Sequence, residues 1–476
     1  MHFLPPNHYL AAEPYVGNNM IRDAILHTLT NILGPQRCLY RKEDLITFSY
    51  DAHTDESLPD AVLFPTTTYE VSQILALADQ HNIPVTARGA GTSICGAPIP
   101  LHHGLVLSFT KMDSILAVDT KNRYAVVQPG VANADLQKAL ASEGFFYPPD
   151  PASLSVSTIG GNVAQNAGGP RCLKYGVTND YILGLEVVLA NGRVLRSGSR
   201  NVKDVTGYNL KSLFCGSEGT LGIVTEITVR VVPLPEAHRT ILAIFNDLEN
   251  TANTVSDIIG SGILPAAMEL MDKVVINAVE DSAGIGLPRE AEGLLLIEVD
   301  GIDEAVEKEM ERIVAKAKTN GAVEVQEART QAESDQLWTA RRSAYGVFAR
   351  LAPHCIVEDA TVPVSNVPAM IRGMREIFDR HQLKVGILAH AGDGNMHPLI
   401  STDQRNQDEQ KRVDKAIREV FELAVQLQGT LTGEHGIGTA KLDFLPLVQD
   451  ETMKSVNATI KKGLDPKGIL NPGKFA

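Results

Sequence analysis

The chain has 476 residues, 44% apolar and 21% charged, with a formal net charge of −14 at pH 7. This length predicts two or three domains. The acidic balance, without a block of Lys and Arg, argues against nucleic acid or an anionic membrane surface as partner. No apolar run approaches the roughly 20 residues of a membrane span, and residues 1–18 lack the apolar centre of a signal peptide. We therefore expect a cytoplasmic protein that does not span a membrane.

The five cysteines are dispersed and form no Cys-x-x-Cys pair; they are Cys38, Cys95, Cys172, Cys215 and Cys355. Neither a disulfide framework nor an iron–sulfur cluster is indicated by this spacing. If the protein moves electrons, it does so without a cluster of its own.

The first half of the chain alternates helix and strand signals. A capping box of Thr67 and Glu70 opens a predicted helix over residues 67–81. Strands are expected at 83–87, 105–107 and 125–127, and a helix at 133–142. Residues 181–195 predict a hairpin that turns at Asn191-Gly192. A strand over 223–232 ends at a Pro-Leu-Pro linker, and a helical segment is expected over residues 1–44.

The second half has a different order of elements. Strands are predicted at 240–245, 294–299 and 323–327, with helices at 253–259 and 303–319 between them. This order predicts an antiparallel sheet backed by helices. Further helices are expected at 332–349, 367–382 and 408–428.

Two polar clusters near the C-terminus carry potential metal ligands. The strand 385–388 is followed by His390, a glycine-containing turn and His397, so that a returning strand could bring the two histidines together. Glu434 and His435 follow about forty residues later. Two histidines and Glu434 can hold a divalent metal with one position open for substrate, which leaves His435 as a base. The opposite assignment makes His435 the third ligand and Glu434 the base.

Other interpretations of these clusters are weaker. Each histidine alone is compatible with an ordinary polar turn. A metalloprotease is not indicated, because the helical His-Glu-x-x-His signature is absent.

Three glycine-rich stretches predict a large bound cofactor. Residues 84–93 leave a strand and enter a loop whose backbone N–H groups and Arg88 suit a pyrophosphate. The loop is neither a G-x-G-x-x-G fingerprint nor a Walker A loop. Residues 148–169 and 215–223 are similarly rich in glycine and amides. The second stretch shows no helical period, and so many glycines and amides imply a backbone pressed closely against something flat or anionic.

The motifs in these stretches resemble flavoproteins of the vanillyl-alcohol oxidase and p-cresol methylhydroxylase type. The resemblance spans residues 45–475 and is strongest to the D-2-hydroxyacid dehydrogenase branch, which holds D-lactate dehydrogenases, glycolate oxidase FAD subunits and D-2-hydroxyglutarate dehydrogenases. It is carried by ARGAGTS, STIGGNVAQNAGG, GSEGTLGIVTE, HAGDGNMHP, GEHGIG and LDPKGILNPGK. The implied fold class is α+β: an FAD-binding domain of two α+β subdomains (45–235), an α+β cap or substrate domain with an antiparallel sheet (236–430), and a C-terminal return onto the flavin (431–476).

The resemblance also implies non-covalent FAD. The metal expected at His390, His397 and Glu434 is zinc, with manganese, iron or cobalt as alternatives. Cys95 is the only candidate for a covalent bond in the first loop, and we expect none. The residues expected to bind FAD are Arg88, Gly89, Ala90, Gly91, Thr92, Ser93, Gly96, Pro149, Asp150, Thr158, Gly160, Gly161, Asn162, Asn166, Gly168, Glu218, Gly222, Ile223 and Asn471.

The substrate-binding residues implied by the resemblance are Arg341, Arg342, Tyr345 and His435. In the hydroxyglutarate enzymes a threonine and a lysine join the arginine that matches Arg341. Tyr345 and Val357 stand at those two places here. Losing the lysine disfavours a second substrate carboxylate, so D-lactate or glycolate is the expected substrate.

The sequence does not identify the electron acceptor, since the chain has no iron–sulfur cluster motif and no nicotinamide-binding fingerprint. The resemblance implies an electron-transfer flavoprotein, an iron–sulfur subunit or a quinone as acceptor, with oxygen as a further option, and a homodimer is compatible with it. Three alternative functions remain: a D-2-hydroxyglutarate dehydrogenase, an alcohol or phenol oxidase, and a non-catalytic FAD subunit that relays electrons.

Overall fold

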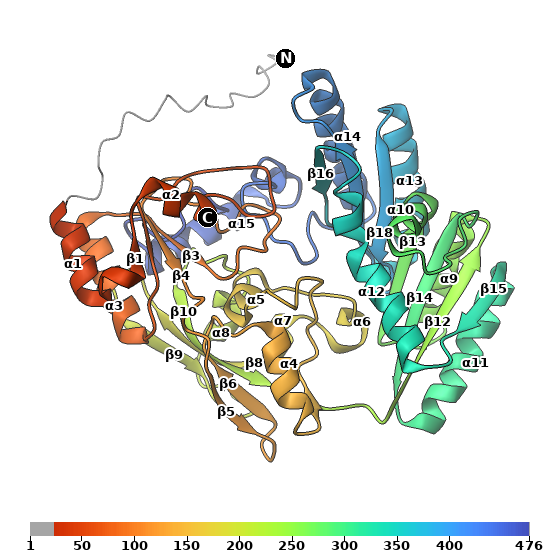
Figure 1. The fold of residues 1–476 in the computed structure, drawn as a ribbon, viewed down its shortest axis with the longest axis horizontal. Coiled ribbons are helices and arrows are strands. Elements are labelled where there is room, and N and C mark those ends of the chain that lie inside the picture. Colours follow the sequence, from red (N-terminus) through yellow and green to blue (C-terminus); the bar gives the residue numbers. More distant parts are fainter. Residues whose placement is uncertain (1–22, 476) are drawn as a thin grey trace.

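The computed structural model describes residues 23–475. Figure 1 shows two halves, an N-terminal half that also carries the C-terminal helix and a second half built on one large sheet. The expectation that residues 1–18 contain no signal peptide lies outside the described residues. Within residues 23–475, no helix is long and apolar enough to cross a membrane.

The first sheet of the N-terminal half has the strand order β1-β2-β4-β3. β2, β4 and β3 are parallel, and β1 is antiparallel to β2. Helices α1 (Asp23–Leu33) and α3 (Thr68–His81) bury their apolar faces against this sheet. α3 begins as predicted, because Thr67 Oγ1 accepts the Glu70 N–H at 3.2 Å. The strands are β1 Cys38–Leu39, β2 Ala61–Leu63, β3 Val85–Arg88 and β4 Leu105–Ser108.

Residues 23–44 differ from the predicted helical segment. They contain α1 and the short α2 (Lys42–Leu45), but β1 lies between them and forms an edge of the first sheet. Cys38 of that edge strand is buried against the core of the first sheet.

The second sheet is antiparallel, in the order β5-β6-β10-β8-β9. The predicted hairpin is confirmed as β8 and β9, which turn at Asn191-Gly192. Helices α4 (Asn133–Ala141) and α8 (Leu210–Phe214) contribute to the core under this sheet. The strands are β5 Ile115–Asp119, β6 Tyr124–Val127, β8 Ile182–Val188, β9 Val194–Gly198 and β10 Ile223–Arg230; β7 (Phe145–Phe146) and β11 (Val232–Pro233) form a small ribbon.

The stretch at residues 148–169 contains a helix although its sequence shows no helical period. Residues Ile159–Gln165 form helix α5, which begins where Thr158 Oγ1 accepts the Gly161 N–H at 3.1 Å. The helix ends at Asn166 in the left-handed conformation, with φ 52°. Seven residues with two glycines are too few to show a helical period in the sequence.

The second half, the cap, is built on an eight-stranded antiparallel sheet in the order β15-β12-β14-β13-β18-β19-β16, with β17 beside β19. The predicted antiparallel sheet backed by helices is therefore confirmed, although β13 and the helix α10 were not predicted. The strands are β12 Ala237–Phe245, β13 Ala267–Asp272, β14 Gly293–Gly301, β15 Ala322–Glu327, β16 His354–Val357, β17 Ala360–Thr361, β18 Lys384–His390 and β19 Asn395–Thr402.

Helices cover both faces of the cap sheet. One face packs on α9 (Leu248–Gly260), α11 (Asp303–Thr319), α13 (Val367–Arg380) and α14 (Gln407–Gln426). The other face packs on α10 (Lys273–Ala283) and α12 (Gln331–Phe348). Side chains alternate between faces along a strand, so the second face also carries Glu269 of β13 and His390 of β18.

The chain then returns to the N-terminal half. Helix α15 (Glu451–Leu464) lies there in Figure 1. The Asn471 N–H donates to Val85 O at 2.8 Å, and its side-chain amide donates to Ala97 O and Glu218 O at 3.0 and 2.7 Å. The C-terminal segment is thereby tied to β3 and to two glycine-rich stretches.

Charged side chains join the two halves. Lys174 and Tyr175 of α6 (Cys172–Tyr175) donate to the carboxylate of Asp300 on β14, at 2.5 and 2.7 Å. Arg171 lies 3.6 Å from Glu298 on the same strand. All of these contacts cross from the N-terminal half to the cap sheet.

Candidate active site

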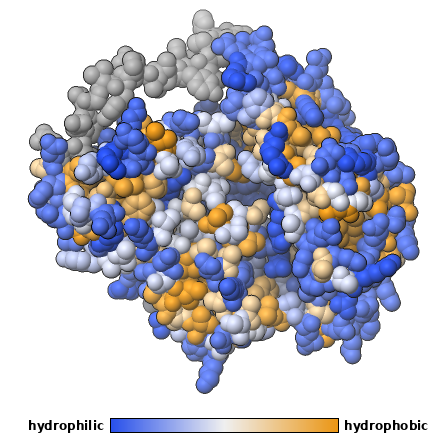
Figure 2. Space-filling view, viewed as in Figure 1, coloured by the Kyte–Doolittle hydropathy of each residue, from blue (hydrophilic) through white to orange (hydrophobic). Residues whose placement is uncertain are grey.

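A cavity of about 720 Å³ lies between the two halves and is lined by residues of both. Figure 2 shows the surface hollowed between them. This volume is in the range of sites that enclose a small molecule or cofactor.

Most of the residues predicted to bind FAD line this cavity. They come from the loop after β3, the start of α5 and the segment before β10. They are Arg88, Gly89, Ala90, Gly91, Thr92, Ser93, Thr158, Gly160, Gly161, Asn162, Glu218, Gly222 and Ile223.

Six residues predicted to bind FAD do not line the cavity: Gly96, Pro149, Asp150, Asn166, Gly168 and Asn471. Their contacts explain why. The Gly96 N–H donates to Asp51, Pro149 O accepts from Asn133, and Asn166 ends α5 and accepts the Asn179 N–H. Asp150 lies 3.8 Å from Arg171, the side chain of Asn471 holds the C-terminal segment, and a Cβ at Gly168 would lie 2.8 Å from a Glu434 oxygen.

Two glycines in the first loop are required by close packing. A Cβ at Gly89 would lie 2.3 Å from Thr158 Oγ1, and a Cβ at Gly91 would lie 2.2 Å from Arg88 Nη2. Gly91 also has a φ of 75°, which disfavours any larger residue. The loop can therefore approach α5 and Arg88 only with glycine at both positions.

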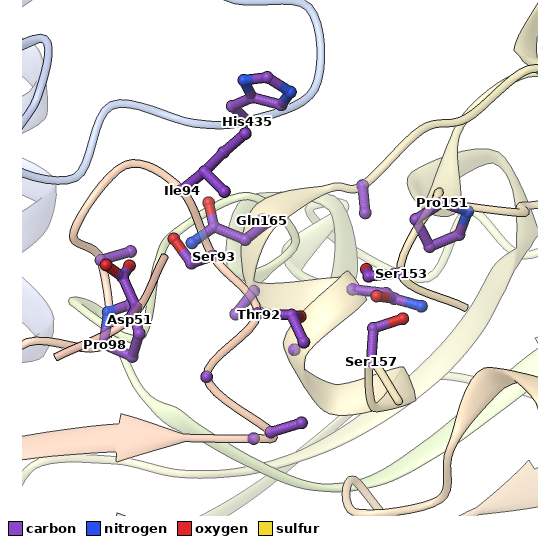
Figure 3. Close-up of a pocket in the computed structure, with 18 of the residues that line it drawn as sticks. Asp51, Thr92, Ser93, Ile94, Pro98, Pro151, Ser153, Ser157, Gln165 and His435 are labelled. Carbon is purple, nitrogen blue, oxygen red and sulfur yellow. The ribbon is translucent and has the colours of Figure 1, made fainter. Parts of the chain in front are cut away.

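Buried polar atoms without hydrogen-bond partners lie along the cavity wall. They include Arg88 Nη1, Ser157 Oγ, Asn162 Nδ2 and Gln165 Oε1. Figure 3 shows Thr92 and Ser93 on one loop, Ser157 and Gln165 on other segments of the wall, and His435 on the C-terminal segment. Buried polar groups are normally paired, so these atoms indicate a polar ligand such as the FAD expected from the sequence.

The predicted metal ligands are brought together at the cap end of the cavity. β18 and β19 form the expected hairpin, in which Leu388 is opposite His397, so His390 and His397 are diagonal neighbours on one face. Their ring centroids are 5.0 Å apart. Glu434 Oε1 lies 3.1 Å from His390 Nε2 and 3.3 Å from His397 Nε2. This is a geometry that three ligands of one metal ion can adopt.

Both histidines use their other nitrogen in a hydrogen bond. His390 Nδ1 lies 2.7 Å from Glu269 Oε1, and His397 Nδ1 lies 3.2 Å from Glu358 O. A carboxylate and a carbonyl can only accept, so Nδ1 carries a proton in each ring, and Nε2 is the nitrogen that faces Glu434 and that a bound metal would use. Histidines that bind metals in proteins are usually oriented in this way.

Glu269 was not predicted from the sequence. It is fully buried on β13 opposite His390, and it also forms an ion pair with Arg341. The apolar run over residues 266–271 could have indicated a buried strand, but nothing local marks its single carboxylate as part of the site.

A second set of potential ligands is Asp359, His397 and His435. One oxygen of Asp359, Oδ2, accepts the backbone N–H groups of Gly433, Glu434 and His435, at 3.1, 3.1 and 2.8 Å, whereas Oδ1 has no hydrogen-bond partner among the described residues. The buried Lys441 ammonium lies 3.8 Å away. Asp359, also missed by the sequence analysis, therefore holds the turn that presents Glu434 and His435.

The same turn is held from the other half of the protein. Glu218 accepts the N–H groups of Ile437 and Gly438 at 2.7 and 2.9 Å. Gly436 has a φ of 87°, and a Cβ there would lie 2.2 Å from Gln165 Oε1. Glu218 also lines the cavity, so a residue predicted to bind FAD links this turn to the cavity wall.

The ionisation of the cluster follows from its burial and its pairing. Burial alone would lower the pKa of His390, but Glu269 and Glu434 outweigh it and hold that pKa well above its usual value. Burial would raise the pKa of Glu434, and His390 and His397 hold it well below the usual value. Burial lowers the pKa of His435 to about 4, so this ring is neutral at pH 7. A neutral imidazole is the form that a general base needs.

The predicted substrate residues line the same end of the cavity: Arg341, Arg342, Tyr345 and His435. The Arg341 guanidinium is paired with Glu269, whereas within residues 23–475 no carboxylate lies within ion-pair distance of Arg342. The Nε atoms of both arginines are buried without a partner. Arg342 therefore presents to the cavity a guanidinium without a carboxylate partner among these residues.

Comparisons with known proteins agree with this architecture. Residues 59–198 match the family "FAD binding domain", and residues 234–475 match "FAD linked oxidases, C-terminal domain". The chain is 47% identical to the glycolate oxidase subunit GlcD of Bacillus subtilis over 458 residues, which covers 96% of this chain and 97% of that protein. The chain belongs to the FAD-linked oxidases. This FAD-linked oxidase is also 33% identical to a D-lactate dehydrogenase of Anaerostipes hadrus, covering 93% and 95% of the two chains.

A likeness to solved structures extends to the whole fold. p-Cresol methylhydroxylase with bound substrate superposes with a TM-score of 0.78, covering 94% of this chain and 96% of that one, at 18% identity. The p-cresol methylhydroxylase fold expected from the sequence is therefore confirmed, and the FAD-linked oxidase is an oxidoreductase.

Proposed function

We propose that this FAD-linked oxidase oxidises a small 2-hydroxy acid, D-lactate or glycolate, to the 2-oxo acid in a reaction that requires a divalent metal. The observation that carries the proposal is the meeting of three groups at one end of the cavity: the cluster of His390, His397 and Glu434, the unpaired Arg342, and the neutral His435. The names of the two relatives, glycolate oxidase subunit and D-lactate dehydrogenase, support the same substrate class.

FAD, when bound, supplies the acceptor for the hydride from the substrate's α-carbon. Its pyrophosphate suits Arg88, whose buried Nη1 has no partner in the protein, and the glycine-rich loop at residues 89–93. The buried Cys95 thiol has a pKa raised by burial to about 12, which disfavours the thiolate needed for a covalent bond to the flavin.

His390, His397 and Glu434 would hold the metal, which would supply a Lewis acid that acidifies the substrate hydroxyl. His435 then takes the hydroxyl proton on Nε2, because Nδ1 faces Asp359 at 3.8 Å. The Asp359 carboxylate stabilises the positive charge that this proton places on the ring.

Arg341 and Arg342 bind the substrate carboxylate. Arg341 offers its unpaired Nε and is kept in place by Glu269, while Arg342 supplies a charge without a carboxylate partner. The neighbouring wall is apolar, from Val357, Leu388 and Leu399. Among the described residues, no lysine lines the cavity, so a second substrate carboxylate would lack its own partner.

Anaerobic titration of the purified flavoprotein tests the proposal. D-lactate or glycolate should bleach the flavin absorbance, and treatment with a chelator should abolish the bleaching until zinc, manganese, iron or cobalt is restored. Bleaching by a metal-free protein would contradict the metal requirement. Bleaching by simple alcohols or phenols alone would favour the alternative oxidase function.

We infer that the electrons leave to a separate protein subunit or a quinone. The relative from Bacillus subtilis is named as a subunit of glycolate oxidase, and no Cys-x-x-Cys pair for a cluster is present in this chain. Slow flavin reoxidation in air, together with rapid reoxidation by a co-purified partner or a quinone analogue, would support this inference.

A further inference from the structure

A second cavity of about 360 Å³ adjoins the first. It lies between the segment at residues 50–56 of the N-terminal half and the end of α12 with β16 in the cap. Three residues line both cavities: Tyr50, Ala52 and Tyr345. The two spaces therefore meet at these side chains.

Helix α12 leads from the second cavity to the substrate end of the first. Arg341, Tyr345 and Ala349 are four residues apart, so they follow one another along one side of the helix. Arg341 lines only the first cavity, Tyr345 lines both, and Ala349 lines only the second. Tyr345 therefore stands between the second cavity and the arginine pair.

The outer side of the second cavity reaches the surface. Ala52, Thr54 and Glu56 line it and are exposed. His354 contributes a polar wall: its Nδ1 accepts the Gln404 N–H at 3.2 Å, so the neutral ring carries its proton on Nε2 and can donate there. Such a donor suits a carboxylate in transit.

We propose that the second cavity is the access vestibule through which small 2-hydroxy acids enter and 2-oxo acids leave, with Tyr345 as its inner wall. The proposal rests on the proposed function for the identity of the acid. FAD would fill the part of the first cavity that runs along the glycine-rich loops. The substrate end near Arg341 and Tyr345 stays in contact with the second cavity through Tyr345.

Blocking the vestibule tests this inference. Thr54→Trp places a bulky side chain in the exposed outer wall, and Ala349→Trp does the same from the cap side. Val323→Trp on β15, exposed and outside both cavities, is the matched control. All three proteins should retain bound FAD and the unfolding midpoint of the parent, which shows that the fold is intact.

Two measurements distinguish a blocked route from a damaged site. In anaerobic stopped-flow reduction by the active acid, both vestibule variants should lower the second-order rate constant by at least about tenfold, while the limiting rate at saturation changes by less than about twofold. Collisional quenching of the bound flavin's fluorescence by iodide should fall in parallel. Iodide quenching needs no substrate, so it decides the route even if no 2-hydroxy acid reduces the flavin and the proposed function fails.

Unchanged second-order rates and unchanged iodide quenching in both variants would overturn the vestibule. A fall of the limiting rate together with the second-order rate would also contradict it, because the substitutions would then act on the reacting site. The control Val323→Trp should match the parent in every measurement.

Discussion

Replacing Glu269 with Gln tests how the cluster of His390, His397 and Glu434 is held in place. The substitution keeps the volume of the side chain, and its carbonyl can still accept from His390 Nδ1. The amide nitrogen, however, carries hydrogens and would face the Arg341 guanidinium, which has only donors. The charge that balances both His390 and Arg341 is lost at a fully buried position.

Two effects of different size are expected. Breaking a buried ion pair by removing one partner costs about 3–5 kcal/mol of unfolding free energy. Removing the carboxylate behind a metal-binding histidine typically weakens metal affinity by about 10–100-fold. We therefore expect Glu269→Gln to lower both stability and metal affinity, and to raise KM for the acid because Arg341 is no longer held in place.

The assay is a competition titration of metal against a chromophoric chelator, beside urea unfolding and flavin content. Glu298→Gln is the matched control. This buried carboxylate lies on the neighbouring strand, 3.6 Å from Arg171, and contacts none of His390, His397 and Glu434. The control variant should lose stability and keep the metal. Parent-like metal affinity in Glu269→Gln would refute the role of Glu269 in holding His390.

Four further predictions follow from the site. His390→Ala and His397→Ala should each remove the metal, measured by elemental analysis, while the flavin spectrum persists; retained metal would contradict the ligand assignment. His435→Asn should keep FAD and metal but slow flavin reduction by about 100-fold or more; loss of metal in this variant with retention in Glu434→Gln would reverse the two roles. D-lactate or glycolate should exceed D-2-hydroxyglutarate by at least about tenfold in kcat/KM, and Val357→Lys should narrow that gap; an unchanged gap would place the specificity elsewhere. Gly91→Ala should yield protein deficient in FAD, because its Cβ would lie 2.2 Å from Arg88 Nη2; full flavin occupancy would show that Arg88 can move away.

Local patterns in the sequence predicted the parts of the site that are close together in the chain. The turn between His390 and His397 is short, so a strand, a turn and a returning strand could be expected to bring the two histidines together, and the hairpin places them on one face. The same holds for α3, whose capping residues are adjacent in sequence.

Residues that reach the site from distant strands could not be predicted in this way. Glu269 on β13 and Asp359 between β16 and β17 lie 121 and 76 residues before their contacts at His390 and His435. Only the tertiary fold brings them close, and a single acidic residue in an apolar run, such as Glu269, carries no local signal. Arg341 pairs with Glu269, whereas Arg342 has no carboxylate partner among the described residues. This difference between the two neighbouring arginines also depends on contacts between distant parts of the chain.

The turn at residues 433–438 has a consequence for protein engineering. Asp359 of the cap accepts hydrogen bonds from the backbone of its first half, and Glu218 of the FAD-binding half accepts them from its second half. A chimera that joins the FAD-binding half of one relative to the cap of another would thus inherit a turn whose two anchors come from different parents. Recombination breakpoints should keep Glu218, Asp359 and the turn matched, or His435 will be misplaced although each half folds.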